Sequence, residues 1–496
     1  KNFSKQIFRI TVHEDFNSRM IENLEVGLPN LKTVIIRCRS SSLQVHDFTL
    51  VDFCEAMVKN KSIEQVSINH HDPIMINDSI SEICNDYLPQ LSNLQYLNLN
   101  DNQLQILPVA KLAPTLLHLH ASKNELLRGP YDSLSSEDTS LDSTNCPSTR
   151  AIVSPRLYAS SFFLSTLEQL KKLQTLDLSC NLFIPAKYGV HLAKALMNLQ
   201  CMENLNLSQN EMDDRAVIFL VPALARMKKL RVLNLSGNHI KDKGAVAVMD
   251  ALNHDGGNGA SLIINNCDNT VSEKKTMVEP PIQVLNLGFN EITAKYFRVP
   301  EALAQLTQLH TLHLNNNPLN AEGAQLVAPA IAKLVKLKHL FLDAQQCLAA
   351  GAKAYSKSII FLKHLETMHF SNNDAEGSGV SLILFALQQC CNTLQHLDLS
   401  HNKMGDIATG MALVMLLRQA KRLKTLSIMT NDISDMGAAS LVQMMQKEIA
   451  KKNAEANLSI HVTRYSHLKT LCLTGNHISR HCIEQITSLL PSNAAF

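Results

Sequence analysis

Hydrophobic residues recur along most of the chain in one arrangement, L-x-x-L-x-L-x-x-N-x-L. Clear copies are LRVLNLSGNHI at 230–240, LHTLHLNNNPL at 309–319, LQHLDLSHNKM at 394–404 and LKTLCLTGNHI at 468–478. Leu397 and Leu399 are two residues apart, so in a strand they point to one side while Asp398 points to the other. Asn402 ends this strand, and we expect its side-chain amide to bond backbone groups of its own copy and of the next. The pattern therefore predicts one short strand in each copy.

The segments between the strands have a different period. Apolar residues there recur three and four positions apart, in QLVAPAIAKL from Gln325, GAVAVMDAL from Gly244, GVSLILFAL from Gly379 and GAASLVQMM from Gly437. This is helical spacing, and Pro329 should kink or shorten the helix in which it lies. A single copy cannot bury its leucines, so stacked copies should form one parallel sheet with a continuous apolar core.

The unit length is nearly constant where the copies are most regular. Copies starting at 309, 337, 365, 394 and 423 are 28, 28, 29 and 29 residues apart, and the copy at 337 carries Gln345 in place of the Asn. With these units the chain resembles the leucine-rich-repeat family, and the helix-containing units resemble its ribonuclease-inhibitor type. The resemblance implies an α/β solenoid shaped like a horseshoe, with a parallel sheet on the concave face and helices on the convex face. We expect about 15–16 repeats.

The regular pattern weakens at both ends of the chain and at three internal places. We predict degenerate N-terminal repeats or a cap over 1–93, a solenoid over 94–478 and a C-terminal capping helix over 479–496. The N-terminal copies keep the apolar spacing, for example at Ile63, Val66 and Ile68, but lack the Asn. Terminal repeats of solenoids are usually atypical, which favours a cap over the alternative of a separate domain.

Insertions are expected near 128–156, 253–281 and 447–465. The first is rich in Ser and Pro, cannot bury a core and is expected to be a flexible, solvated loop. A phosphorylation target and a partner-binding lid are the other interpretations of this insertion. Before it, the copies at Leu94 and Leu116 are only 22 residues apart, too few for a full helix between them.

Composition excludes several classes of protein. The net charge of +2 gives no reason to expect nucleic acid or an anionic membrane as partner. No apolar run approaches the roughly 20 residues that span a bilayer. The 12 cysteines include no CxxC pair, so we expect neither a disulfide scaffold nor a zinc site, and a reducing, cytoplasmic location fits best. The sequence begins at Lys1 rather than Met, which suggests that the natural N-terminus lies upstream.

Equivalent strand positions should form columns, because stacked strands lie about 4.8 Å apart. The central column is Asn98, His120, Asp177, Asn206, Asn234, Asn286, His313, Phe341, His369, Asp398, Ser427 and Cys472, and a side column includes Thr311, His339, Thr367 and His396. The predicted partner-binding residues are Asn234, Asn286, His313, His339, Phe341, His369, His396 and Asp398. An exposed aromatic among hydrogen-bonding groups suits a protein interface.

Two other interpretations of this patch stay open. It can be a chance run of polar residues on a solvated face. It can also be a metal site made by His313, His369 and Asp398, although Phe341 interrupts the column and no closed set of four ligands is apparent. If the patch binds a partner, titration of its histidines near neutrality would make binding sensitive to pH.

No catalytic motif is present, since the chain lacks GxxxxGK[ST], GxSxG and HExxH. We therefore expect a non-enzymatic module that binds a macromolecular partner on the concave face. Neither a cofactor, a nucleic acid nor a small-molecule substrate is expected. The resemblance implies the same, because leucine-rich-repeat proteins generally bind other proteins through this face.

Two further interpretations concern the biological role. The ribonuclease inhibitor itself captures basic enzymes with an acidic concave surface, whereas the central column here has acids only at Asp177 and Asp398, which argues against a ribonuclease as partner. The alternative is a GTPase-activating or GTPase-regulating protein with the same unit type. The irregular insertions and imperfect copies also resemble those of repeat effectors that intracellular bacterial pathogens deliver into the host cytosol.

Overall fold

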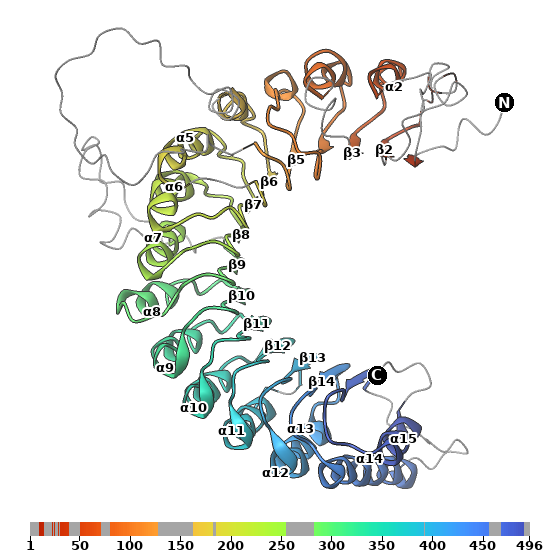
Figure 1. Ribbon diagram of the computed structural model, residues 1–496, viewed down its shortest axis with the longest axis vertical. Coiled ribbons are helices and arrows are strands. Elements are labelled where there is room, and N and C mark those ends of the chain that lie inside the picture. The colour runs from red at the N-terminus through yellow and green to blue at the C-terminus, as the bar shows by residue number, and fades with distance from the viewer. Residues whose placement is uncertain are drawn as a thin grey trace, which may run out of the picture. The chain divides into compact units, whose positions relative to one another are not determined.

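The computed structural model describes residues 9–13, 22, 24, 28, 30–38, 50–70, 80–126, 162–181, 185–253, 282–390, 392–455 and 468–490. The chain divides into two compact units, unit 1 (1–232) and unit 2 (233–496). The described strands are hydrogen-bonded in sequence order, β1 to β15, in a parallel sheet. In each unit the strands form one layer and the helices another (Figure 1). The predicted α/β leucine-rich-repeat solenoid is confirmed.

Unit 1 contains the strands of the degenerate and early copies. They are β1 (Arg9–His13), β2 (Thr33–Cys38), β3 (Gln65–His70), β4 (Tyr96–Asn98), β5 (His118–His120), β6 (Thr175–Asp177) and β7 (Asn204–Asn206). Val34 pairs with Val66 and Ile36 with Ile68, and all four side chains are fully buried. The copies that lack the Asn thus still form strands, because their alternating apolar residues enter the same core.

Unit 2 contains the more regular copies. Strand β8 (Val232–Asn234) crosses the unit boundary, and it is followed by β9 (Val284–Asn286), β10 (Thr311–His313), β11 (His339–Phe341), β12 (Thr367–His369), β13 (His396–Asp398), β14 (Thr425–Ser427) and β15 (Thr470–Cys472). From β10 to β15 one residue of each strand points into the core, in the row Leu312, Leu340, Met368, Leu397, Leu426 and Leu471. This row is the inward-facing position of the repeat pattern.

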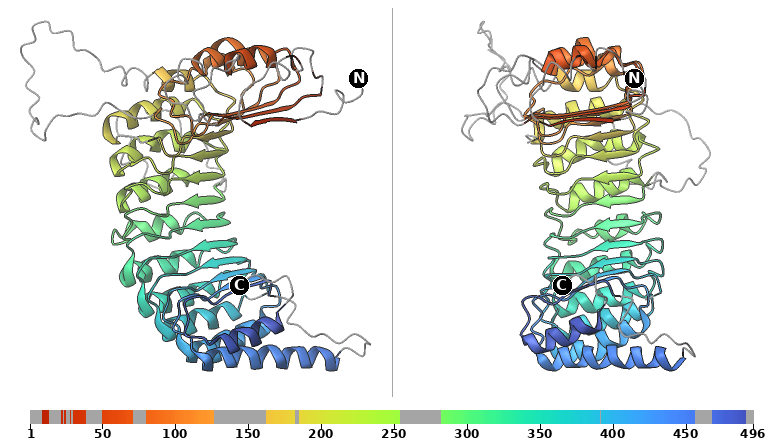
Figure 2. Two further views of the ribbon diagram at one scale, coloured as in Figure 1. Left: turned by 45° about the vertical axis from the view of Figure 1, so that its right-hand side comes forward. Right: turned by 90° about the vertical axis from the view of Figure 1, so that its right-hand side faces the viewer.

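The helices cover the opposite side of the core (Figure 2). The α-helices are α2 (Leu50–Met57), α5 (Pro185–Met197), α6 (Asp214–Arg226), α7 (Asp242–Leu252), α8 (Arg298–Leu303), α9 (Asn320–Ile331), α10 (Leu348–Ile359), α11 (Glu376–Gln388), α12 (Gly405–Ala408), α13 (Val414–Gln419), α14 (Asp435–Glu455) and α15 (Arg480–Leu489). The described residues also contain the π-helices η2 (Ile83–Tyr87) and η6 (Thr409–Leu413) and the 3-10 helices η3 (Leu88–Gln90) and η4 (Ala110–Leu112). The connection from β4 to β5 contains only the short helix η4, as predicted from the 22 residues that separate the copies at Leu94 and Leu116.

The helix in which Pro329 lies is not shortened. Helix α9 runs through Pro329 to Ile331 and has 12 residues, as does α10 in the next copy. The missing N–H of Pro329 falls in the last turn, where only a few residues follow and little of the helix depends on it. At the other end of α9, Gly323 is required by a close approach, because a Cβ there would lie 2.3 Å from the carbonyl oxygen of Thr293.

The Asn that ends each strand joins adjacent copies, but in the direction opposite to the one expected. Nδ2 of Asn402 donates to the carbonyl oxygens of Leu399 in its own copy (3.0 Å) and of Phe370 in the preceding copy (2.7 Å). Its Oδ1 accepts from the backbone N–H of Asn373, also in the preceding copy, at 3.2 Å. The side chain points backwards because the turn that precedes it leaves those backbone groups open. The same bonds recur at the buried Asn317 and Asn431.

Several expectations about organisation concern residues that the structure does not describe. The insertion expected near 128–156 lies outside the described residues, and so does that near 253–281 apart from Asn253. Of the third, residues 447–455 form the last turns of α14, which spans 21 residues. The proposed cap, solenoid and terminal helix remain predictions as domains. No helix in the described ranges is both long enough and apolar enough to cross a membrane.

Candidate functional site

The residues that alternate with the buried row make the strand face, which we define as these alternating positions of the strands; in β12 the first of them, Thr367, is itself buried. In unit 2 its central column is His313, Phe341, His369 and Asp398, and the neighbouring column is Thr311, His339, Thr367 and His396. The structure thus brings together six of the eight predicted residues on β10 to β13. Asn286 on β9 pairs with His313, and Asn234 lies on β8. We call the six residues on β10 to β13 the histidine–phenylalanine patch.

The centre of the patch is a row of three rings, of which the first two are stacked and the third is tilted. The centroids of His313 and Phe341 are 4.0 Å apart with an interplanar angle of 4°, and those of Phe341 and His369 are 4.8 Å apart at 48°. All three side chains are half-buried. The facing surfaces of His313 and Phe341 are covered by their stacking contact. A partner would therefore meet mainly ring edges, which carry the positive part of the ring quadrupole, and imidazole nitrogens.

His313 is neutral at physiological pH. Burial of its ring, followed by the charges of His369 and His339, lowers its pKa from 6.5 to about 4. Burial also lowers the pKa of His396, with a further contribution from the nearby ammonium of Lys424. The expected titration near neutrality does not hold for His313, because an imidazolium at this place would lose solvation.

An acidic residue that sequence reasoning missed stands beside His369. Oδ2 of Asp343 is 3.9 Å from Nδ1 of His369, and Oδ1 accepts hydrogen bonds from the backbone N–H and the hydroxyl of Ser371 at 2.7 and 2.8 Å. Burial raises the pKa of Asp343, against the opposing effects of those hydrogen bonds. The signal was present, because Asp343 is the single acid at the position that follows the L-x-L of each copy.

The remaining polar members of the patch are held in place by their neighbours. Nδ1 of His339 lies 3.0 Å from Oγ1 of Thr367 in the adjacent strand. Asp398 accepts from the N–H and the hydroxyl of Ser400 at 2.9 and 2.6 Å, which caps its own turn. Beside the patch, on β9, Oδ1 of Asn286 accepts from the backbone N–H of Gly288 at 3.0 Å. The patch is therefore preorganised, with its ring stack at the centre and satisfied polar groups around it.

The metal interpretation gains no support from the geometry. Phe341 separates His313 from His369, and Asp398 is engaged with Ser400. Within the described ranges, no group of three or more His, Cys, Asp or Glu side chains could hold a metal ion.

The cysteines offer little nucleophilic chemistry. The eight that the structure describes are free thiols, four of them buried. Burial raises the pKa of Cys84 and of Cys347 to about 12, and it also raises the pKa of Cys54. A thiol that stays protonated is a poor nucleophile, so these buried cysteines act as packing residues.

Unit 1 carries a second group of rings on its own strand face. Tyr96 on β4 lies 6.2 Å from His118 and 5.1 Å from His120 on β5, measured between ring centroids. Nδ1 of His120 is 3.8 Å from Oδ2 of Asp177 on β6. Burial alone would raise the pKa of Asp177, but hydrogen bonds from His120 and Ser179 outweigh it and lower the pKa. Sequence reasoning placed His120 and Asp177 in the central column but missed Tyr96 and His118, which hold adjacent side-column positions.

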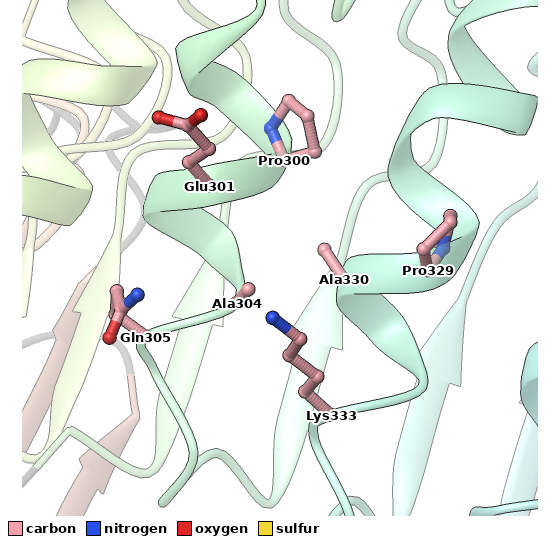
Figure 3. Close-up of a pocket in the computed structure, with 7 residues that line it drawn as sticks. All are labelled: Pro300, Glu301, Ala304, Gln305, Pro329, Ala330 and Lys333. Atoms are coloured by element: carbon pink, nitrogen blue, oxygen red, sulfur yellow. The ribbon is translucent and has the colours of Figure 1, made fainter.

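A cavity of about 330 Å³ lies on the helix side of unit 2, away from the strand face (Figure 3). Pro300 and Ala304 of the α8 segment face Pro329 and Ala330 of α9 across it, and Glu301 and Lys333 lie at its border. The cavity exists because small side chains stand where these two helices meet. Among the described residues that line it there is no histidine, cysteine or hydroxyl group.

Comparison with known proteins identifies the repeats. A Leucine Rich repeat family model matches residues 226–249, 305–328 and 390–407, and a Leucine Rich Repeat model matches 93–111. The ribonuclease inhibitor of Sus scrofa is 27% identical over 184 residues, which cover 31% of this chain and 40% of that protein. That of Mus musculus is 25% identical over 249 residues, 44% of this chain and 53% of that protein. The matches thus span about half of these relatives or less.

Two solved structures are similar over most of the chain. A TLR13–ssRNA13 complex matches with a TM-score of 0.48 and 14% identity, covering 96% of this chain and 59% of that one. An internalin (inlF) from Listeria monocytogenes matches with a TM-score of 0.36 and 15% identity, covering 98% and 86%.

Leucine-rich-repeat proteins in general mediate interactions with proteins and other ligands, and the ribonuclease-inhibitor-like families are typically non-catalytic binding modules. The chain contains leucine-rich repeats, and part of it is similar to ribonuclease inhibitor.

Proposed function

We propose that this protein is a non-enzymatic interaction module that binds a protein partner through the histidine–phenylalanine patch of unit 2. The observation that carries the proposal is the half-exposed ring group on adjacent strands, in which Phe341 stacks on His313 and makes a tilted contact with His369. Aromatic side chains are enriched where protein interfaces gain most of their binding free energy. A stack that is already ordered loses little conformational entropy when a partner binds.

The chemistry of the patch describes the partner surface that would fit it. Ring edges and imidazole N–H groups favour oxygen acceptors, while the apolar part of Phe341 favours an aliphatic or aromatic side chain. Asp343 and Asp398 accept hydrogen bonds from Ser371 and Ser400, so their carboxylates are already partly satisfied. The fitting partner presents a neutral surface with an apolar centre and carbonyl or hydroxyl oxygens around it.

The test begins with crosslinking and mass spectrometry of proteins captured from a cell lysate by the wild-type chain. A protein lost on Phe341→Ala is then purified and titrated against both forms. We expect Phe341→Ala to weaken binding about tenfold or more, because truncation of a central interface aromatic costs roughly 2 kcal/mol or more. The double variant His313→Ala/His369→Ala removes the stacking partners and should weaken the same interaction.

Phe361→Ala is the matched control, because Phe361 is also exposed, at 52%, but lies outside the strands. It should leave the affinity unchanged. An affinity that is the same for wild type, Phe341→Ala and the double histidine variant would exclude the patch as the binding site.

The other roles named from the sequence are separate proposals with separate tests. Regulation of a GTPase would appear as faster or slower GTP hydrolysis when the chain is added to a panel of GTPases. Delivery into a host cytosol would appear in a translocation assay with a reporter fusion. Neither assay depends on which surface of the chain contacts the partner.

A further inference from the structure

The strand face of unit 1 contains a hollow whose charge differs from that of the patch in unit 2. The hollow has a volume of about 280 Å³ and is lined by residues of β1 to β4. Arg9 and Arg37 supply its charge, and no acid is among the described residues that line it. Glu64, the acid that directly precedes β3, pairs instead with Lys32 at 2.7 Å.

Strand register fixes the separation of the two arginines. Arg9 on β1 pairs with Thr33 on β2, and Arg37 follows four residues further along β2. At about 3.3 Å per residue the two Cα positions are about 13 Å apart along the strand direction. Both side chains are exposed and line the same hollow, so they bracket it from its two ends.

The surface of the hollow between the two arginines is formed by both polar and apolar side chains. Thr33, Gln65 and Ser67 line it, and Oγ1 of Thr33 donates to Oε1 of Gln65 at 3.3 Å. Ile35 and the ring of Tyr96 add apolar surface. These groups can bond the backbone of an extended segment, while each guanidinium can hold a carboxylate in a bidentate pair.

We propose that this hollow, which we call the arginine hollow, binds an extended acidic peptide segment of a partner protein, with carboxylates about four residues apart. In an extended chain, Cα atoms four residues apart are separated by about 13 Å, which matches the separation of the two arginines along the strand direction. The inference rests on the proposed binding role of the strand face but uses only residues of unit 1. A single-stranded nucleic acid fits less well, because two cations and one aromatic ring are few for a polyanion that is bound through many phosphates and stacked bases.

The test is fluorescence anisotropy of the full chain with the labelled peptide SESGSES, whose two Glu residues are four apart. We expect binding that weakens as salt is added, since the attraction is between charges. Arg9→Gln with Arg37→Gln should reduce the affinity about tenfold or more, and the neutral peptide SQSGSQS should bind no better to wild type than to this variant. Arg9→Lys with Arg37→Lys keeps the charge and loses the bidentate geometry, so its affinity should fall in between.

The matched control is Arg215→Gln with Arg226→Gln, which removes two exposed arginines from α6 of the same unit. It should bind SESGSES as wild type does. Failure of wild type to bind the peptide, or equal binding by the Arg9/Arg37 variant, would overturn the proposal. Tighter binding of an oligothymidylate that depends on the same two arginines would assign the hollow to nucleic acid instead. None of these results depends on Phe341, so failure here is distinguishable from failure of the proposed function.

Discussion

At the scale of the residue, the replacement of the strand-ending Asn by Gln345 is accompanied by a compensating hydrogen bond. Gln345 stands where the other regular copies have Asn, and its Nε2 still donates to the carbonyl oxygen of Leu314 in the preceding copy, at 3.1 Å. The extra methylene carries Oε1 to the hydroxyl of Tyr355, which donates to it at 2.7 Å. Tyr355 is fully buried, so this pair is formed inside the core.

We predict that Tyr355→Phe destabilises the protein by about 1–3 kcal/mol, because Oε1 of Gln345 would remain buried without a donor. The measurement is the urea unfolding midpoint of wild type and variant. Adding Gln345→Asn to Tyr355→Phe should recover part of the loss, since Asn restores the arrangement seen at Asn317 and Asn373. An unchanged midpoint for Tyr355→Phe would mean that the hydroxyl contributes nothing to the ladder.

At the scale of the element, adjacent strands determine the ionisation of His313. His313 is uncharged near neutrality because strand β11 places Phe341 against its ring and because burial removes water. The same residue on an isolated strand would titrate near its ordinary pKa. The lowered pKa of His313 therefore results from its surroundings in the neighbouring copies.

This lowered pKa predicts a pH dependence of stability. The unfolded chain binds a proton at His313 below about pH 6.5, whereas the folded chain binds it only below about pH 4. The unfolded state therefore holds more protons between these values, and stability falls as the pH falls from about 6.5 to about 4, at a slope of at most about 1.4 kcal/mol per pH unit.

His313→Gln keeps a polar side chain that cannot be protonated, so its urea midpoint should fall less than that of wild type between neutral and mildly acidic pH. His191→Gln is a suitable control, because His191 is exposed on α5. It should retain the wild-type dependence. Equal pH dependence in wild type and His313→Gln would show that His313 titrates alike in the folded and unfolded states.

At the scale of the whole molecule, the contacts of each copy are with its neighbours in the sequence. Each described strand pairs only with the one before and the one after it, and helices such as α9, α10 and α11 contact each other in the same order. Stability in such an arrangement is close to a sum of the individual copies and their shared interfaces. A destabilising substitution in one copy should therefore affect mainly that copy and its neighbours.

We predict that Leu426→Ala in β14 costs about 2–5 kcal/mol and that the loss is confined to nearby copies. Leu426 is fully buried, and β14 pairs with β13 and β15. Hydrogen exchange followed by mass spectrometry should accelerate in β13 to β15 and change little in β2 to β4. Leu97→Ala in β4 is the matched variant and should give the converse pattern. A uniform acceleration through both units would contradict independent local stability.

Much of the fold was predictable because the repeat pattern is local. The spacing of Leu397 and Leu399, and the helical period after Gly379, each specify one element without reference to the rest of the chain. The columns of the strand face could then be predicted by aligning equivalent positions of successive copies. The direction of the Asn402 hydrogen bonds could not be predicted, because it depends on which carbonyl groups the preceding turn leaves open.

The candidate sites were predictable only in part. Position in the pattern placed His313, Phe341 and His369 side by side. The position of the Asp343 carboxylate beside His369, on the adjacent strand, was not predicted. The arginine hollow was not predicted either, because it lies on the N-terminal copies, where the repeat pattern is weakest.

The amino-acid sequence by itself determined the repeated unit, the inward leucines and the order of the strands, because each is specified within about thirty residues of chain. Only the tertiary structure decided which side chains share a ring stack, which histidine loses its charge and where two arginines face one hollow. Those properties depend on distances between copies and on burial, and neither quantity is present in any single copy.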